Sequence, residues 1–260
     1  MLGAIAGDVV GSAFEARNIK TTEFELFSEY SSFTDDTVLT TATAFAIMSD
    51  GDYGAAYKIF GRMYPLAGYG LDFGSWLARD DAEPYNSWGN GSAMRVSPVG
   101  FAFDTEQEVL REAQRSAECT HDHPEGIKGA QAVALAVFLA RQGAEKALIR
   151  REIASRFAYD LDRTVAQIRP GYEFDVSCQG SVPEAIIAFL EADSFEHSLR
   201  LAVSLGGDSD TQACIAGAIA QAWYGEMPEE LVEEVRRRLP RDLLEIVDEF
   251  CGKYGVPACD

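Results

Sequence analysis

The chain has 260 residues, and 47% of them are hydrophobic, which is enough to form one sizeable buried core. Its formal net charge of −20 excludes nucleic acids and anionic membranes as ligands held by general electrostatics. No run of about eighteen uncharged apolar residues occurs, and the N-terminal segment lacks the basic start of a signal peptide. We therefore expect a cytoplasmic protein that does not insert into membranes, and we favour a monomer.

The first segment carries three glycines at intervals of four residues, Gly3, Gly7 and Gly11. On a helix, residues at this spacing share one face, and a stripe of glycines lets a second helix approach closely. We interpret them as packing residues. Glu15 continues the same face one turn further along. The spacing alone leaves two interpretations of Glu15 open, a solvated surface residue or a functional carboxylate at the end of the stripe.

A first acidic string, Thr34-Asp35-Asp36-Thr37, opens an apolar helical run over residues 38–48. Ser, Thr and Asp before such a run are ordinary helix N-caps, because their oxygens accept backbone N–H groups that the helix leaves unpaired. A cap needs only one acceptor, however, and this string supplies two carboxylates and two hydroxyls. Oxygen ligands of this kind suit Mg²⁺, Mn²⁺ or Ca²⁺.

Helical periodicity continues through most of the chain and predicts the following helices: residues 52–63, 105–118, 125–141, 145–157, 183–192, 195–205, 212–224, 229–239 and 242–254. The alternation typical of strands is almost absent, and residues 168–176 contain Pro170-Gly171 and are predicted to form a loop. We expect an all-α fold, a compact multi-helix bundle in which residues 1–260 form one domain. The five cysteines are dispersed without a CxxC pair, so we expect reduced thiols and no zinc site.

Two polar clusters lie between residues 89 and 123. Gly89, Asn90, Gly91 and Ser92 form a loop whose backbone N–H groups suit a phosphate or a sugar, although an ordinary helix-entry turn has the same composition. His121 belongs to Thr120-His121-Asp122-His123, which suits either ligand contact or the capping of the next helix. Because the acidic strings already offer enough oxygen ligands, we assign His121 to the substrate and not to a metal.

A second acidic string, Asp208-Ser209-Asp210-Thr211, opens the run over residues 212–224 and matches the first in composition. If the fold brings the two strings together, at least four Asp carboxylates converge. Crowded acids repel each other unless protons or cations compensate their charge. The pair of strings therefore predicts a site for two divalent cations.

In this order, the motifs resemble those of the ADP-ribosylglycohydrolase family. The resemblance covers nearly the whole chain, at residues 3–8, 11–15, 34–37, 89–95, 120–121 and 204–211. It implies a compact all-α bundle with two Mg²⁺ or Mn²⁺ ions in a central cleft. The metal ligands that it implies are Thr34, Asp35, Asp36, Asp208, Asp210 and Thr211.

The resemblance also implies an activity, the hydrolysis of the glycosidic bond at C1″ of the distal ribose of ADP-ribose. The substrate would be an ADP-ribosylated protein or small molecule, whose acceptor the sequence leaves open. Glu15 matches the family's acid beside the metals, and Asp36 is the second catalytic candidate. The residues implied in substrate binding are Gly89, Asn90, Gly91, Ser92, His121, Gly207 and Ser209.

Two other classes of protein are compatible with parts of this pattern. A non-catalytic binding or structural relative, like the lens-crystallin members of the family, would retain the fold without the activity. Complete acidic strings favour an enzyme over this alternative. A metal-dependent phosphohydrolase on a helical fold would typically use His-Asp pairs, and this chain has only three histidines.

Overall fold

The computed structural model describes residues 1–49 and 51–256. Within them lie fifteen helices and a single isolated bridge, between Gly89 and Ser177, and this confirms the all-α fold class. The helices are α1 (Leu2–Glu15), α2 (Asp35–Met48), α3 (Tyr53–Met63), α4 (Leu71–Leu77), α5 (Gly91–Met94), α6 (Ser97–Ala102), α7 (Glu106–Glu118), α8 (Pro124–Arg141), α9 (Lys146–Phe157), α10 (Val165–Ile168), α11 (Cys178–Glu191), α12 (Phe195–Leu205), α13 (Ser209–Tyr224), α14 (Glu229–Arg238) and α15 (Arg241–Tyr254). None of these helices in the described part of the chain is long and apolar enough to cross a bilayer.

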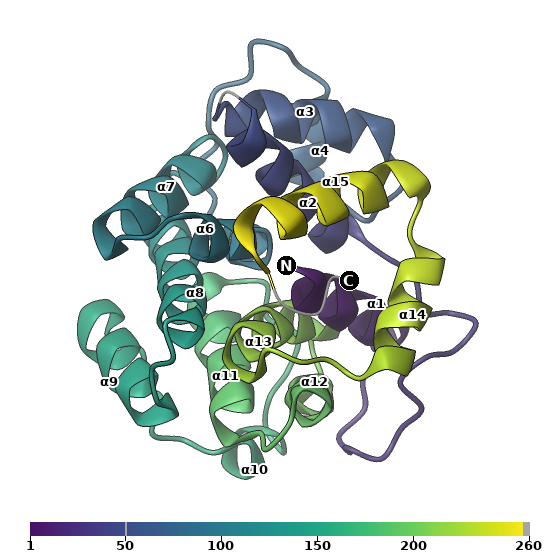
Figure 1. The fold of residues 1–260 in the computed structure, drawn as a ribbon, viewed down its shortest axis with the longest axis vertical. Coiled ribbons are helices and arrows are strands. Elements are labelled where there is room, and N and C mark those ends of the chain that lie inside the picture. Colours follow the sequence, from purple (N-terminus) through teal and green to yellow (C-terminus); the bar gives the residue numbers. More distant parts are fainter. Residues whose placement is uncertain (50, 257–260) are drawn as a thin grey trace.

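Helices α1 and α13 pack against each other in the centre of the molecule, and the other helices surround them (Figure 1). The glycine stripe makes this contact possible. A Cβ atom built on Gly7 would lie 2.0 Å from the carbonyl oxygen of Ala213, and one on Gly3 would lie 2.4 Å from that of Gly217. The packing interpretation of the stripe is thus confirmed, and α1 lies in a fixed register on α13.

Helix α11 begins well before the predicted start. Residues 183–192 were expected to form a helix starting at Pro183, but α11 starts at Cys178 and contains Pro183 in its interior. The cap is Ser177, whose hydroxyl accepts a hydrogen bond from the N–H of Gly180 at 3.0 Å.

Cys119, Cys178 and Cys214 are free, whereas Cys251 is disulfide-bonded, so the expectation of reduced thiols is wrong for Cys251.

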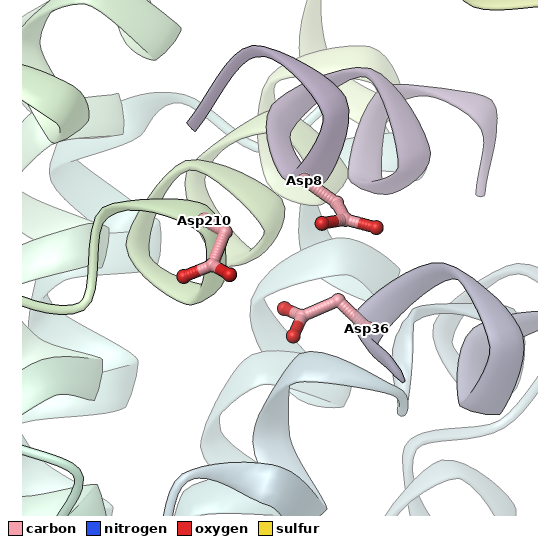
Figure 2. A group of neighbouring side chains, drawn as sticks. All are labelled: Asp8, Asp36 and Asp210. Atoms are coloured by element: carbon pink, nitrogen blue, oxygen red, sulfur yellow. The ribbon is translucent and has the colours of Figure 1, made fainter. Parts of the chain in front are cut away.

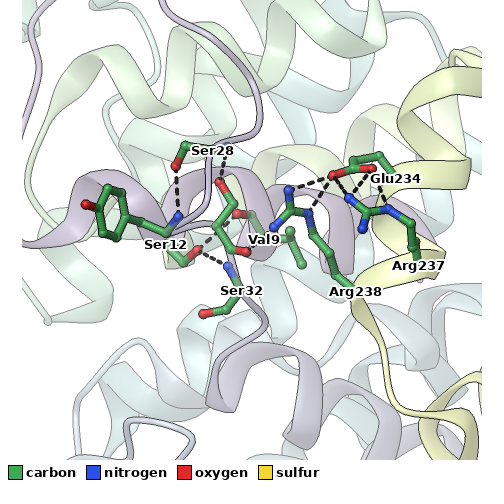
Figure 3. A network of polar contacts seen from close by, with 9 residues as sticks. Val9, Ser12, Ser28, Ser32, Glu234, Arg237 and Arg238 are labelled. Atoms are coloured by element: carbon green, nitrogen blue, oxygen red, sulfur yellow. Dashed lines mark hydrogen bonds and ion pairs between the residues drawn. The ribbon is translucent and has the colours of Figure 1, made fainter.

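The segment between α1 and α2 has no helix, and polar contacts hold it in place (Figure 3). The Ser12 hydroxyl on α1 donates to the carbonyl of Val9 at 3.0 Å and accepts from the N–H of Ser32 at 3.1 Å. From the other side, Arg238 of α14 donates to the carbonyl of Ser31 at 2.5 Å. These contacts fix the chain immediately before the first acidic string.

Candidate metal centre and substrate cavity

Three helices bring their carboxylates together at one point. Asp36 lies in the first turn of α2, Asp210 in the first turn of α13, and Asp8 in the middle of α1 (Figure 2). One carboxylate oxygen from each of these three residues lies within 4.8 Å of the other two. Asp210 also belongs to a second cluster of this kind, with Glu15 and Asp208. The two acidic strings therefore meet, as the matched composition predicted.

Capping accounts for only one oxygen of these strings. The hydroxyl of Thr34 caps α2 by accepting from the N–H of Asp36 at 3.3 Å. The carboxylate of Asp208, at the N-cap of α13, makes no capping hydrogen bond. Asp35 and Asp36 are inside α2 and not at its cap position. Helix capping thus does not explain why two carboxylates stand at each helix start.

The environment of these acids favours their protonated forms. Burial raises the pKa of Asp8 from 3.8 to about 6, and hydrogen bonds from Thr34 and Thr37 limit that rise. Burial, together with the charge of Asp8, raises the pKa of Asp35 to about 8. The pKa values of Asp36 and Asp210 rise well above the ordinary value for the same reason, burial first and then neighbouring carboxylates. Ionising these acids together would concentrate negative charge in a place with little water, so the charged forms are costly unless a cation compensates them.

The chemistry of this donor set fits a divalent cation. Among residues 1–49 and 51–256, no lysine or arginine forms an ion pair with these carboxylates. Oδ1 of Asp36 is buried and has no hydrogen-bond partner, although its Oδ2 accepts from the hydroxyl of Thr211 at 3.3 Å. An unpaired buried carboxylate oxygen is costly, and a hard cation would compensate it.

Asp35, Asp36, Asp208 and Asp210 line a cavity of about 510 Å³, whereas Asp8 lies behind its lining. Most of the residues that the motifs point to line this cavity: Glu15, Thr34, Asp35, Asp36, Gly89, Asn90, Gly91, His121, Asp208, Asp210 and Thr211. Asn90 and His121 are almost fully buried there, whereas Glu15 is exposed at its edge. Partial burial and the charge of Asp208 raise the pKa of Glu15.

Three of the expected binding residues do not line the cavity. The hydroxyl of Ser92 donates to the carbonyl of Gly126 at 2.7 Å, and that of Ser209 donates to the carbonyl of Gly11 at 2.9 Å. Gly207 has a φ of 89°, and a Cβ there would lie 2.8 Å from the ring of Tyr172. In this structure these residues shape the backbone behind the cavity.

Asn90 connects the glycine loop to the second acidic string. Its side-chain Nδ2 donates to Oδ2 of Asp208 at 2.7 Å, and its backbone N–H donates to the carbonyl of Val176 at 2.8 Å. The side-chain amide of Asn90 is therefore already bonded to the carboxyl group of Asp208, and this bond orients Asp208. His121 lies against the same loop, because a Cβ on Gly91 would be 3.1 Å from its Nε2.

A comparison with known proteins shows which family the chain belongs to. A family model described as ADP-ribosylglycohydrolase matches residues 1–258. The chain belongs to the ADP-ribosylglycohydrolase family. The resemblance drawn from the motifs is thereby confirmed, and so is the kind of fold that it implied.

Known members of the family match most of the chain. It is 29% identical to the ADP-ribosylhydrolase ARH3 of Homo sapiens, over 88% of this chain and 86% of that protein. It is also 29% identical to the ADP-ribosylarginine hydrolase Tri1 of Pseudomonas putida (strain GB-1), over 56% of this chain and 42% of that protein. A solved structure titled "ADP-ribosylglycohydrolase-related protein complex" superimposes with a TM-score of 0.69 at 25% identity, covering 91% of this chain and 93% of that chain.

Two residues that hold parts of this ADP-ribosylglycohydrolase site in place were not singled out from the sequence. Asp8 is fully buried and accepts from the backbone N–H groups of Thr34 and Thr37, at 2.9 and 3.1 Å, and from both their hydroxyls. Asn18 donates to the carbonyl of Glu15 at 2.7 Å and accepts from the N–H of Gly207 at 2.6 Å. For Asp8 there was a signal, because an acid in the middle of an apolar helix is rarely solvated. Asn18 gave none.

Proposed function

We propose that this protein is a divalent-cation-dependent ADP-ribosyl hydrolase. It cleaves the glycosidic bond at C1″ of the distal ribose and releases ADP-ribose from a modified protein or small molecule. The observation that carries the proposal is the convergence of both acidic strings in one cavity with the Gly89–Gly91 loop and His121, in a chain of this family. We take residues 1–260 as a single domain, a proposal supported by the family match over residues 1–258.

We infer that two Mg²⁺ or Mn²⁺ ions are held by Thr34, Asp35, Asp36, Asp208, Asp210 and Thr211. The inference is supported by the hard oxygen donors, by the unpaired Oδ1 of Asp36 and by the absence of cationic partners among the described residues. Bound there, the ions would orient ribose hydroxyls and lower the pKa of a bound water. Asp8 and Asn90 would act behind them, holding Thr34 and Asp208 in place.

We infer that the diphosphate and ribose lie against the Gly89–Gly91 loop and His121. The glycines let the ligand approach the backbone closely, and His121 is the nearest side chain with a ring nitrogen. Ser92, Gly207 and Ser209 then contribute through the backbone that they support, since their side-chain positions face away from the cavity.

Glu15 is our candidate for the group that holds and transfers a proton. It lies at the edge of the cavity beside Asp208 and Asp210, and partial burial raises its pKa, so it keeps its proton to a higher pH than an ordinary glutamate does. Asp36 is the second catalytic candidate, since its unpaired oxygen is able to accept a hydrogen bond from water.

The acceptor is open between arginine, serine, another group and a free ADP-ribose derivative. A panel of ADP-ribosyl-arginine peptide, ADP-ribosyl-serine peptide and O-acetyl-ADP-ribose, with Mg²⁺ or Mn²⁺ and with EDTA, tests class and acceptor together. We expect metal-dependent release of ADP-ribose from at least one. Glu15→Gln should lower the rate about 10²–10⁴-fold and leave ADP-ribose affinity nearly unchanged.

The alternative is a non-catalytic binding or structural relative. If calorimetry demonstrates that metal and ADP-ribose bind but no substrate of the panel is hydrolysed, this alternative replaces the enzyme.

A further inference from the structure

His121 presents one particular ring nitrogen to the cavity. Its Nε2 lies nearest the glycine loop, since a Cβ built on Gly91 would be 3.1 Å from it and one on Gly89 would be 3.6 Å from it. The other nitrogen, Nδ1, lies 2.8 Å from the hydroxyl oxygen of Thr120, which is fully buried. Which nitrogen carries the proton decides whether the cavity meets a hydrogen-bond donor or an acceptor.

A buried arginine decides this question. Arg95 has no exposed surface, and its Nη2 donates to Oγ1 of Thr120 at 2.8 Å and to the carbonyl of Ser116 at 3.1 Å. Its guanidinium also lies over the ring of Tyr57, 4.1 Å from the ring centre. A guanidinium has donors only, so Thr120 must accept from Arg95.

The single proton of the Thr120 hydroxyl is then free to point to Nδ1 of His121. In the opposite arrangement Nδ1–H would donate to Thr120, and the buried hydroxyl proton would need another acceptor. Among the described residues, the strong hydrogen-bond partners of this oxygen are Arg95 and His121, and the Cys119 thiol is a third, weaker partner. Beside it lies the thiol of Cys119, which is only a weak acceptor and is itself turned to the carbonyl of Ser116.

We propose that Arg95 and Thr120 are positioning residues that hold His121 as the neutral tautomer with the proton on Nε2. His121 therefore offers the cavity a hydrogen-bond donor, and its partner is an oxygen acceptor such as a phosphate or ribose oxygen. In this tautomer Nε2 has no free lone pair, so His121 serves neither as a metal ligand nor as a general base through that atom. Burial and the charge of Arg95 lower the pKa of His121 well below its usual value, in agreement with a neutral ring.

The assignment concerns the free protein, so it is tested without substrate. In ¹⁵N-labelled full-length protein loaded with Mg²⁺, long-range proton–nitrogen correlations distinguish the two neutral tautomers and the imidazolium. The signal of His121 is identified by its loss in His121→Asn. We expect a protonated Nε2 and an unprotonated Nδ1 near neutral pH. A protonated Nδ1, or a doubly protonated ring, would overturn the proposal whatever the function of the protein.

A pair of Thr120 variants tests the relay itself. Thr120→Ser keeps the hydroxyl and should keep the tautomer, whereas the nearly isosteric Thr120→Val removes it and should give a mixture of both neutral forms. An unchanged tautomer in folded Thr120→Val would remove Thr120 from the relay. If Thr120→Val does not fold, the wild-type and Thr120→Ser spectra still decide the assignment.

A binding measurement, which rests on the proposed function, separates the two proposals. Thr120→Val should weaken ADP-ribose binding by up to about tenfold, the effect of one neutral hydrogen bond, with Mn²⁺ affinity unchanged. If the tautomer shifts as expected but ADP-ribose affinity does not change, the relay is supported and the proposed contact between His121 and the substrate is wrong.

Discussion

Asp8→Asn is the most informative substitution in the acidic cluster, because it removes a charge and keeps the contacts. The Asp8 carboxylate accepts from Thr34 and Thr37 through one oxygen and from the Thr34 hydroxyl through the other, at 2.7 Å. An asparagine places its amide oxygen at the first position and its NH₂ at the second. The Thr34 hydroxyl needs only to rotate in order to accept from it. The variant should therefore fold with the native geometry.

The expected gain in stability follows from the pKa. Burial raises the pKa of Asp8 from 3.8 to about 6. Well below pH 3.8 the carboxyl is protonated, and therefore neutral, in both the folded and the unfolded chain. It then has no effect on the pH dependence of the free energy of unfolding. As the pH rises, the unfolded chain releases its proton first, so the folded state loses stability until the pH exceeds 6. The full penalty is about 3 kcal/mol, which the neutral amide does not carry.

Urea unfolding in EDTA, followed by circular dichroism, measures this penalty. We expect metal-free Asp8→Asn to be about 1 kcal/mol more stable than wild type at pH 4.5 and about 3 kcal/mol more stable at pH 8. Glu83→Gln, which neutralises an exposed carboxylate, is the control and should change stability by less than about 0.5 kcal/mol at either pH. Equal stability of Asp8→Asn and wild type at pH 8, or a gain that does not depend on pH, would refute the reasoning.

Removing an acid from either string should also stabilise the metal-free protein. Asp36→Ala and Asp210→Ala should each unfold at or above the wild-type midpoint in EDTA at pH 8, because a buried repelling charge is gone, and both should lose the stabilisation that Mn²⁺ gives the wild type. If both variants fail to fold, the acids are needed for the fold itself, and the argument from charge repulsion is wrong. Gly7→Ala should cost about 3 kcal/mol of unfolding free energy, because its Cβ would lie 2.0 Å from a backbone oxygen of α13. Gly74→Ala, with nothing within 4 Å, is its control and should be neutral or stabilising by up to about 1 kcal/mol.

The long helices were predictable from sequence because each has a hydrophobic face that repeats over several turns. The predicted helix over residues 195–205 coincides with α12, and that over residues 145–157 differs from α9 by one residue. Helices α4, α5, α6 and α10 were not predicted, because four to seven residues are too few to establish a helical period. The start of α11 was wrong because Pro183 looks like a first-turn residue, whereas Ser177 provides the cap.

The acidic strings could be found because their composition exceeds what helix capping needs. The direction of a side chain could not be found in this way. Ser92 and Ser209 belong to the motifs that identify the family, yet both hydroxyls bond to backbone carbonyls behind the cavity. Asp8 is the opposite case, since its contacts with Thr34 and Thr37 arise only when α1 and α2 pack together. A motif gives residue types in order, and tertiary packing decides which of them face the ligand.

The packing also separates the parts of the site that must be rigid from those that determine specificity. The carboxylates come from α1, α2 and α13, which pack against one another in the core, and the glycine stripe fixes the register of α1 on α13. A metal centre needs this rigidity, because the ligand positions must hold to within a fraction of an ångström.

The rim of the cavity is built differently. Its lining includes Leu71 and Phe174, from two segments, one at α4 and one between α10 and α11. Leu71 is 91% exposed and Phe174 is 53% exposed, so neither is held by the core. Substitutions there change contacts with a ligand at little cost in stability, whereas substitutions around Gly7 or Asp8 alter the fold or its charge balance. Acceptor specificity in this family member should therefore be sought in these two segments, with the carboxylate cluster left intact.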